Sequence, residues 1–185
     1  MPRTSQQFKE MQQERIDSIL ESSLILYALN NGKITIDEVA KHANCSHGII
    51  YHYFNNSEAI IEKLLSVKSY LDLKSSLIKQ YKGMYAKDAI GNIAKTMLNF
   101  STTAGICYGK ILIEETGKTS LRKTLESLVE KGQKEGDITG GNSIEIVDCF
   151  FYLLNGYYLS VLLSKKRTIS PPPIDNVLEI FRKRR

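Results

Sequence analysis

The 185-residue sequence predicts an all-α protein, and three observations support that prediction. Apolar residues recur every three or four positions through most of the chain, as at Ile16, Ile19 and Leu20. Ser, Thr or Asn precedes several of these stretches, where such side chains cap the free N–H groups of a helix. No segment of any length alternates apolar and polar residues, as a half-buried β-strand would.

The first predicted helix runs from Ile16 to Ala28 and ends at Asn30-Asn31-Gly32. Its apolar stripe can cover the two shorter helices that follow, which would be unstable alone in water. The polar residues from Met1 to Gln13 are predicted either as a disordered tail or as an extension of this helix.

Two short helices joined by a tight turn are predicted between Thr35 and Ser57. Thr35, with Glu38 three residues later, has the pattern of a capping box at the start of the first. Asn44-Cys45 makes the turn, and Ser46 is the predicted N-cap of the second helix, residues 47–54. This is the layout of a helix-turn-helix, whose second helix enters the major groove of DNA.

The same segment resembles the TetR family of transcriptional regulators. The matching residues are Thr35, Val39-Ala40, Ala43 to Ser46, Gly48, Ile50 to Phe54 and Glu58, within a resemblance that extends from Ile16 to Leu65. Two positions depart from the family pattern: Asn44 replaces a turn glycine, and Ser57 replaces a lysine that contacts a DNA phosphate. Asn tolerates the left-handed conformation. Losing one phosphate contact would make the logarithm of the DNA-binding constant fall less steeply with the logarithm of the salt concentration, by about 0.9 in the slope.

The resemblance implies that this segment binds double-stranded DNA through its exposed side. Ile50 and Phe54 are assigned to the core, and Thr35 would contact a phosphate through its hydroxyl or its backbone N–H. The predicted DNA-binding residues are Thr35, Ser46, His47, Gly48, Ile49, Tyr51, His52 and Tyr53. All three histidines of the chain lie here, but their spacing does not form a metal site, and no metal or other cofactor is predicted.

The rest of the chain is also predicted to be helical. Asn55 with Glu58 forms a second capping-box pattern, which begins one long helix reaching about Tyr81. Further helices are predicted at 87–100, 106–116, 120–131 and 144–164, with a last one after Pro171-Pro172-Pro173. The predicted domains are a helix-turn-helix DNA-binding domain at 1–58 and a helical effector-binding and dimerisation domain at 59–185.

The segment 144–164 is apolar on nearly all sides, so we expect it to be buried on two faces. One face would pack within its own domain and the other against a second copy. The predicted homodimer forms through residues 144–164 and 173–182 as a four-helix bundle, as the resemblance also implies; a large monomer core is the alternative. A twofold dimer would place two recognition helices about 34–36 Å apart, one turn of DNA.

The predicted function is that of a ligand-responsive regulator, a repressor released from a palindromic operator by a small apolar or aromatic molecule. The candidate ligand-binding residues are Phe100, Cys107, Tyr108, Tyr152 and Asn155, and core packing is the alternative for each. An enzyme is not predicted, because the C-terminal part holds no histidine and no convincing nucleophile, carboxylate-pair or phosphate-binding glycine pattern.

The charge distribution keeps a second function open. Residues 1–60 hold five Lys/Arg against seven Asp/Glu, whereas residues 165–185 hold seven against two. The net charge of +5 therefore sits at the C-terminus and is no evidence for DNA binding. An acidic N-terminal part and Ser57 favour the alternative of a helical ligand- or protein-binding module whose helix-turn-helix no longer binds DNA. No signal peptide or membrane span is predicted, and three widely spaced cysteines indicate reduced thiols in a cytoplasmic protein.

Overall fold

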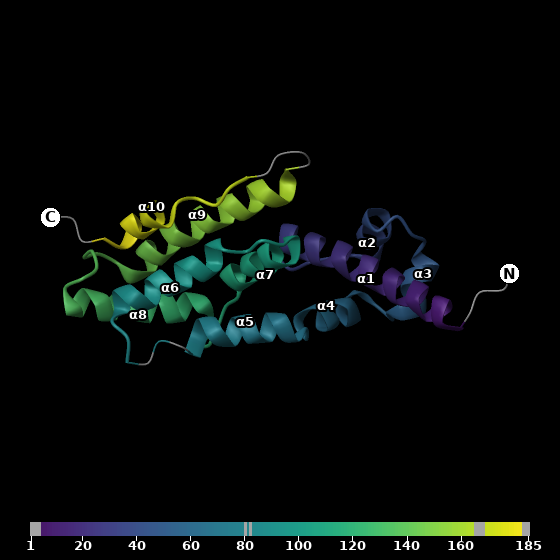
Figure 1. Ribbon diagram of the computed structural model, residues 1–185, viewed down its shortest axis with the longest axis horizontal. Helices are drawn as coiled ribbons and strands as arrows, with labels where there is room; N and C mark the ends of the chain where they lie inside the picture. The colour runs from purple at the N-terminus through teal and green to yellow at the C-terminus, as the bar shows by residue number, and fades with distance from the viewer. Residues whose placement is uncertain (1–4, 80, 82, 165–168, 183–185) are drawn as a thin grey trace. The chain divides into compact units, whose positions relative to one another are not determined.

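The computed structural model describes residues 5–79, 81, 83–164 and 169–182, and this part of the chain is helical without a β-strand (Figure 1). The predicted all-α class is confirmed. The chain forms two compact units, here called the head, which ends at Lys68, and the body, which begins at Ser69. The sequence motif alone places the domain boundary earlier, at residue 58, whereas the compact head also includes the next helix.

The head consists of four helices, α1 (Ser5–Leu29), α2 (Ile36–His42), α3 (His47–Tyr53) and α4 (Ser57–Leu65). Helix α1 packs against α2 and α4, and α2 packs against α3. The fully buried apolar residues of this core are Ile19, Ala28, Val39, Ile50 and Ile60. Of the two alternatives for the polar N-terminal residues, the helical extension holds from Ser5 onward.

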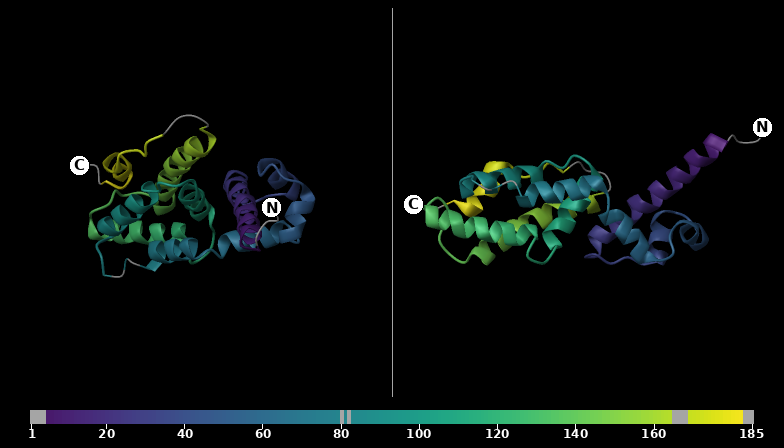
Figure 2. Two further views of the ribbon diagram at one scale, coloured as in Figure 1. Left: turned by 45° about the vertical axis from the view of Figure 1, so that its right-hand side comes forward. Right: turned by 90° about the horizontal axis from the view of Figure 1, so that it is seen from below.

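The body contains the remaining elements. They are α5 (Lys68–Lys79), α6 (Ala86–Leu98), α7 (Thr103–Glu114), α8 (Leu121–Glu135), α9 (Ser143–Leu163), α10 (Ile174–Leu178) and the 3₁₀ turn η1 (Glu179–Phe181). Helix α9 packs against α7 and α8, and α8 also packs against α6; Figure 2 shows these helices bundled together. The predicted N-caps Ser120 and Asn142 each accept a backbone hydrogen bond at their helix starts.

The crossing of α7 and α9 is close because Gly109 has no side chain. A Cβ atom at this position would lie 2.6 Å from the Phe100 ring and 2.8 Å from the Tyr158 hydroxyl oxygen. The Tyr158 hydroxyl donates a 2.6 Å hydrogen bond to the Met97 carbonyl oxygen. That carbonyl lies in the last turn of α6, where helix carbonyls have no partner within the helix, so the contact joins α9 to the end of α6.

The single long helix predicted from Asn55 to Tyr81 was wrong. Helix α4 ends at Leu65, and the Ser66 hydroxyl donates a 3.0 Å hydrogen bond to the Lys63 carbonyl oxygen. A side chain that bonds its own last turn competes with continuation of the helix. The predicted N-cap was also one residue early, because Asn56 rather than Asn55 accepts the hydrogen bond from Ala59 N–H, at 2.8 Å.

The C-terminal segment 173–182 does not form a long helix that could enter a four-helix bundle. It contains five residues of α-helix followed by one 3₁₀ turn. Its apolar residues Val177 and Phe181 are buried within the body, where α10 packs on α6 and the Phe181 ring lies 5.4 Å from that of Phe150. This part of the predicted dimer interface is therefore corrected: its apolar stripe is already covered by its own chain.

Candidate nucleic-acid interface

The start of α2 is a closed capping box, as predicted. The Thr35 Oγ1 accepts a 3.2 Å hydrogen bond from the Glu38 N–H. The Glu38 carboxylate accepts in return from the Thr35 N–H at 2.9 Å and from its hydroxyl at 2.8 Å. Both Thr35 groups predicted to contact a phosphate are thus bonded to a carboxylate, which a phosphate would have to displace.

The turn between α2 and α3 has the backbone that its sequence indicates. Asn44 adopts a left-handed conformation with φ of 48°, one of the few non-glycine side chains that do so readily. The Cys45 N–H donates a 3.0 Å hydrogen bond to the Ala40 carbonyl oxygen. Ser46 then caps α3, accepting from the Ile49 N–H at 3.4 Å. Asn44 therefore fills the position of the usual glycine.

Helix α3 has one exposed side and one buried side. The exposed residues there are Ser46, His47, Gly48, Tyr51 and His52. Ile50 is fully buried, while Ile49, Tyr53 and Phe54 are half-buried at the margin. Tyr51 is 55% exposed, so its ring is accessible on this side of α3. Five of the eight predicted DNA-binding residues thus lie together on this surface.

A close contact between a carboxylate and an imidazole joins α2 to α3 on the same surface. The His47 Nε2 lies 3.2 Å from an Asp37 carboxylate oxygen. Both residues line an open groove of about 620 Å³ between the two helices, together with Lys41 and Ser46. Sequence reasoning missed Asp37, because a surface carboxylate in the first turn of a helix is common.

Ser57 is the first residue of α4, and its hydroxyl donates a 3.2 Å hydrogen bond to the Glu58 carboxylate. In this setting the side chain offers no cation to a phosphate. Within the described residues, no three His, Cys, Asp or Glu side chains are grouped so that they could hold a metal ion.

The five predicted ligand-binding residues are not brought together. Cys107 and Tyr108 are buried in α7, where the Tyr108 ring stacks on Tyr70 at 5.0 Å. Burial raises the pKa of the Tyr108 hydroxyl. Phe100 packs against Tyr158, whereas Tyr152 is 71% exposed on α9 and lines no interior space. Asn155 differs from the others, because its Oδ1 is buried and has no hydrogen-bond partner among the described residues.

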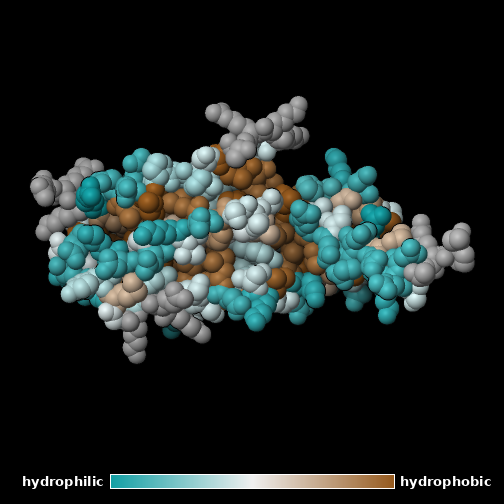
Figure 3. Space-filling view, in the orientation of Figure 1, coloured by the Kyte–Doolittle hydropathy of each residue, from teal (hydrophilic) through white to brown (hydrophobic). Residues whose placement is uncertain are grey.

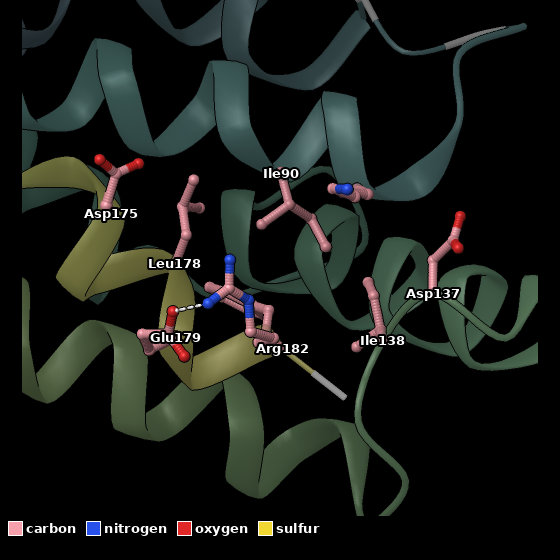
Figure 4. Close-up of a pocket in the computed structure, with 9 residues that line it drawn as sticks. Ile90, Asp137, Ile138, Asp175, Leu178, Glu179 and Arg182 are labelled. Atoms are coloured by element: carbon pink, nitrogen blue, oxygen red, sulfur yellow. Dashed lines mark hydrogen bonds and ion pairs between the residues drawn. The ribbon is translucent and has the colours of Figure 1, made fainter. Parts of the chain in front are cut away.

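A cavity of about 510 Å³ lies elsewhere in the body, between α6, the loop after α8, and the C-terminal elements (Figure 4). Ile90, Ile138 and Phe181 are buried and give it an apolar floor. Charged side chains of both signs stand around it, and Glu179 forms an ion pair with Arg182 there. Its lining comes from segments far apart in the sequence, so no local pattern could have predicted it.

The loop that lines this cavity is attached to both of its neighbours. The Thr139 N–H donates a 3.0 Å hydrogen bond to the Phe181 carbonyl oxygen, and Ile138 pairs with Arg182 in an isolated β-bridge. The Gln133 side chain of α8 bonds the carbonyl oxygens of Thr139 and Gly141 at 2.9 and 3.0 Å. The cavity is therefore formed by hydrogen-bonded segments.

Helix α9 keeps an uncovered apolar side. Exposed residues follow one another at helical spacing on it, namely Cys149, Tyr152, Gly156, Ser160 and Leu163. A Cβ atom at Gly156 would meet no other atom within 4 Å, so a second helix could approach closely there. Figure 3 shows hydrophobic side chains gathered over this region. Among the described helices, α9 alone is long and apolar enough to cross a membrane, a test that the core helices of soluble proteins also pass.

Comparisons with known proteins agree with this geometry. Residues 32–64 match the family model of bacterial regulatory proteins of the tetR family. The HTH-type transcriptional regulator YvkB of Bacillus subtilis (strain 168) is 27% identical over 148 residues, covering 75% of this chain and 77% of that protein.

Solved structures share the fold. A tetR-family regulatory protein from Rhodococcus RHA1 superposes with a TM-score of 0.54 at 13% identity, covering 92% of this chain and 98% of that one. A transcriptional regulator from Saccharomonospora viridis, crystallised with choline, gives a TM-score of 0.50 at 17% identity, covering 90% and 93%.

A capped α2, a left-handed Asn44 and an exposed α3 define a helix-turn-helix protein of the transcription-regulator class. With the match of residues 32–64, the helix-turn-helix of this chain is similar to that of the bacterial tetR-family regulators. Regulators of this family are DNA-binding transcription factors rather than enzymes, act as dimers and bind small-molecule effectors. They are soluble cytoplasmic proteins.

Proposed function

We propose that this protein is a ligand-responsive repressor that binds a palindromic operator as a homodimer in the cytoplasm. The observation that carries the proposal is the exposed side of α3, where hydrogen-bonding side chains and Tyr51 stand on a short helix whose opposite side is anchored by Ile50. A rigid core beneath an exposed polar helix is the arrangement that reading a major groove requires.

The DNA contacts would divide into two kinds. Ser46, His47 and Gly48 begin α3 and would meet base edges or the DNA backbone, with Ile49 and Tyr51 against thymine methyl groups or sugars. His52 and Tyr53 would contact phosphates, as would Thr35 once Glu38 releases it. The His52 and Tyr53 rings lie edge to face at 4.8 Å, so they would act as a pair.

The second copy would pack on the uncovered side of α9. Its support is the row of exposed residues there and the open space beside Gly156. We expect Tyr152→Glu to convert the dimer to a monomer, because it places a charge in an apolar interface. Tyr85→Glu is the matched control, since Tyr85 is 69% exposed at the N-cap of α6. Light scattering after size-exclusion chromatography measures both; a Tyr152→Glu dimer would contradict this interface.

The effector would bind in the body, and the cavity beside α10 is the space that best fits it. Pockets of about 300–1,000 Å³ with an apolar floor and a few polar groups are typical of small-molecule sites. The Saccharomonospora viridis regulator, which shares this fold, was crystallised in complex with choline, and this supports binding of a small molecule by a protein of this fold. The apolar floor of the cavity beside α10 favours a small apolar or aromatic ligand. A coupling free energy of about 1–3 kcal/mol between ligand binding and DNA binding would suffice to release DNA.

This site is tested by filling it. A library of small apolar and aromatic molecules is screened for release of bound DNA, and Leu178→Trp is then compared with the natural protein. We expect the variant to bind DNA normally and to lose its response, because Leu178 lines the cavity. A full response in the variant would move the effector site elsewhere, with the buried Asn155 Oδ1 as the next candidate.

A second candidate function has specific support. The residues up to 60 carry two more acidic than basic side chains, and Ser57 and Glu38 both weaken phosphate contacts. These features favour a ligand- or protein-binding module whose head has lost DNA binding.

Footprinting on DNA upstream of the protein's own gene separates the two functions. The repressor hypothesis expects a protected palindrome whose affinity falls steeply between about 50 and 200 mM salt. Absence of any protected site at the lower salt concentration would favour the second candidate.

A further inference from the structure

The contact between Asp37 and His47 connects two helices of the head at the surface proposed to face DNA. Asp37 is the second residue of α2 and His47 the first of α3. The Oδ1 atom of Asp37 lies 3.2 Å from the Nε2 atom of His47. The Asp37 side chain is 83% exposed and the His47 side chain is 55% exposed. An exposed pair of this kind contributes only about 0–1 kcal/mol to the free energy of unfolding. The contact between Asp37 and His47 therefore adds little to the stability of the head.

The chemistry of the pair fixes what His47 can offer to a ligand. An ionised carboxylate only accepts hydrogen bonds, so the Asp37 oxygen 3.2 Å from Nε2 favours the tautomer in which the imidazole proton sits on that nitrogen. In a neutral imidazole the other nitrogen, Nδ1, is then an acceptor. The contact with Asp37 thus favours the tautomer of His47 whose acceptor is Nδ1.

The groove around the pair gives this acceptor a place to act. The groove is lined by three charged or basic side chains, namely Asp37, Lys41 and His47. Cys45 adds a thiol and Ser46 a hydroxyl. Of the base edges in the major groove, the amino groups of cytosine N4 and adenine N6 are donors, whereas guanine and thymine present acceptors.

We propose that Asp37 is a positioning residue that sets His47 to accept a hydrogen bond from the amino group of a cytosine or adenine in each half-site. This inference rests on the proposed function, because it requires α3 to face the major groove. One such hydrogen bond corresponds to about a fivefold preference over the other two bases.

The first test needs no DNA. Three-bond NMR couplings at pH 8 measure whether the His47 side chain occupies one χ1 rotamer. We expect one rotamer in the natural protein and averaging in Asp37→Ala, with Asp17→Ala as a control that removes the same charge from α1 away from α3. Identical couplings in the natural protein and in Asp37→Ala would overturn the positioning role, whatever the protein binds.

The second test is selection from randomised duplex DNA at pH 8. We expect one position per half-site to be enriched in cytosine or adenine, and Asp37→Ala to relax that position about fivefold while the others keep their preference. Asp37→Ala combined with His47→Ala should behave as His47→Ala alone. A uniform affinity change at all positions would mean that Asp37 acts only through its charge, which would overturn the proposal.

The two tests separate the failure of this inference from that of the proposed function. If the natural protein enriches no sequence while its His47 rotamer depends on Asp37, the repressor function fails and base readout by His47 fails with it. If it enriches a palindrome that Asp37→Ala leaves unchanged, the repressor function stands and this inference fails.

Discussion

The head and the body differ in how their contacts are made. In the head, the important contacts join residues a few positions apart, such as Thr35 with Glu38 and Ser46 with Ile49. In the body they join distant helices, such as Tyr158 with Met97 and Thr139 with Phe181. Local contacts therefore form the surface proposed to read DNA, whereas the arrangement of the body depends on contacts between residues far apart in the sequence.

The largest expected effect is in the core of the head. Ile50→Ala should destabilise the head by about 2–5 kcal/mol, because it leaves a cavity beneath α3. Hydrogen exchange should accelerate at head amides while α8 and α9 stay protected. Ile49→Ala, at a half-buried position, is the matched control and should cost less. Equal acceleration in both units would contradict their separate organisation.

The next effect concerns the body. Gly109→Ala should destabilise it by about 1–3 kcal/mol, because the new methyl group meets the Phe100 and Tyr158 rings. Gly91→Ala is the matched control, because a Cβ there meets nothing within 4 Å and should gain about 0.5–1 kcal/mol of helix propensity. Urea denaturation followed by circular dichroism measures both. Stabilisation by both substitutions would show that the α7–α9 crossing can relax.

Tyr158→Phe should cost about 1–2 kcal/mol, because the Met97 carbonyl oxygen loses its donor. The pH dependence provides a second readout. Burial raises the pKa of Tyr158 well above its ordinary value, so the unfolded chain loses this proton first. The protonated Tyr158 hydroxyl therefore contributes its full share to the stability of the fold below about pH 10, and this contribution is lost as the pH rises further.

Denaturation at pH 8 and at about pH 10.5 should give a smaller alkaline loss of stability in Tyr158→Phe than in the natural protein. Tyr85→Phe, at an exposed position, should leave both values unchanged. An undiminished alkaline loss in Tyr158→Phe would assign that loss to other tyrosines, among them Tyr81, whose pKa burial raises to about 12.

The smallest expected effect concerns the helix caps of the head. Thr35→Ala should cost about 1 kcal/mol, because it opens the capping box. Ser46→Ala should cost less, since the Ser46 bond to Ile49 N–H is longer, at 3.4 Å. Thermal unfolding of the two variants compares them directly. The reverse order would mean that the Glu38 carboxylate stabilises α2 without Thr35.

The sequence predicted the head well because its signals are local. The capping box at Thr35, the left-handed Asn44 and the Ser46 cap each depend on residues within four positions. The break after Leu65 was missed because the apolar pattern continues across it, while Ser66 ends the helix through its own hydroxyl.

The body was predicted less well for a physical reason. The helices themselves follow from periodicity, but which faces meet depends on contacts between distant residues. The apolar stripe of Val177 and Phe181 fits burial against a second copy or against its own chain, and the structure has the second arrangement. The cavity beside α10 likewise has no sequence signal, because three segments far apart in the sequence line it.

Hydrogen exchange measured with and without the DNA that the protein protects identifies the residues that DNA covers. We expect DNA to slow exchange mainly at residues 35–54, in α2, the turn and α3. Slowing confined to the body, or no slowing at α3 while DNA is bound, would contradict it.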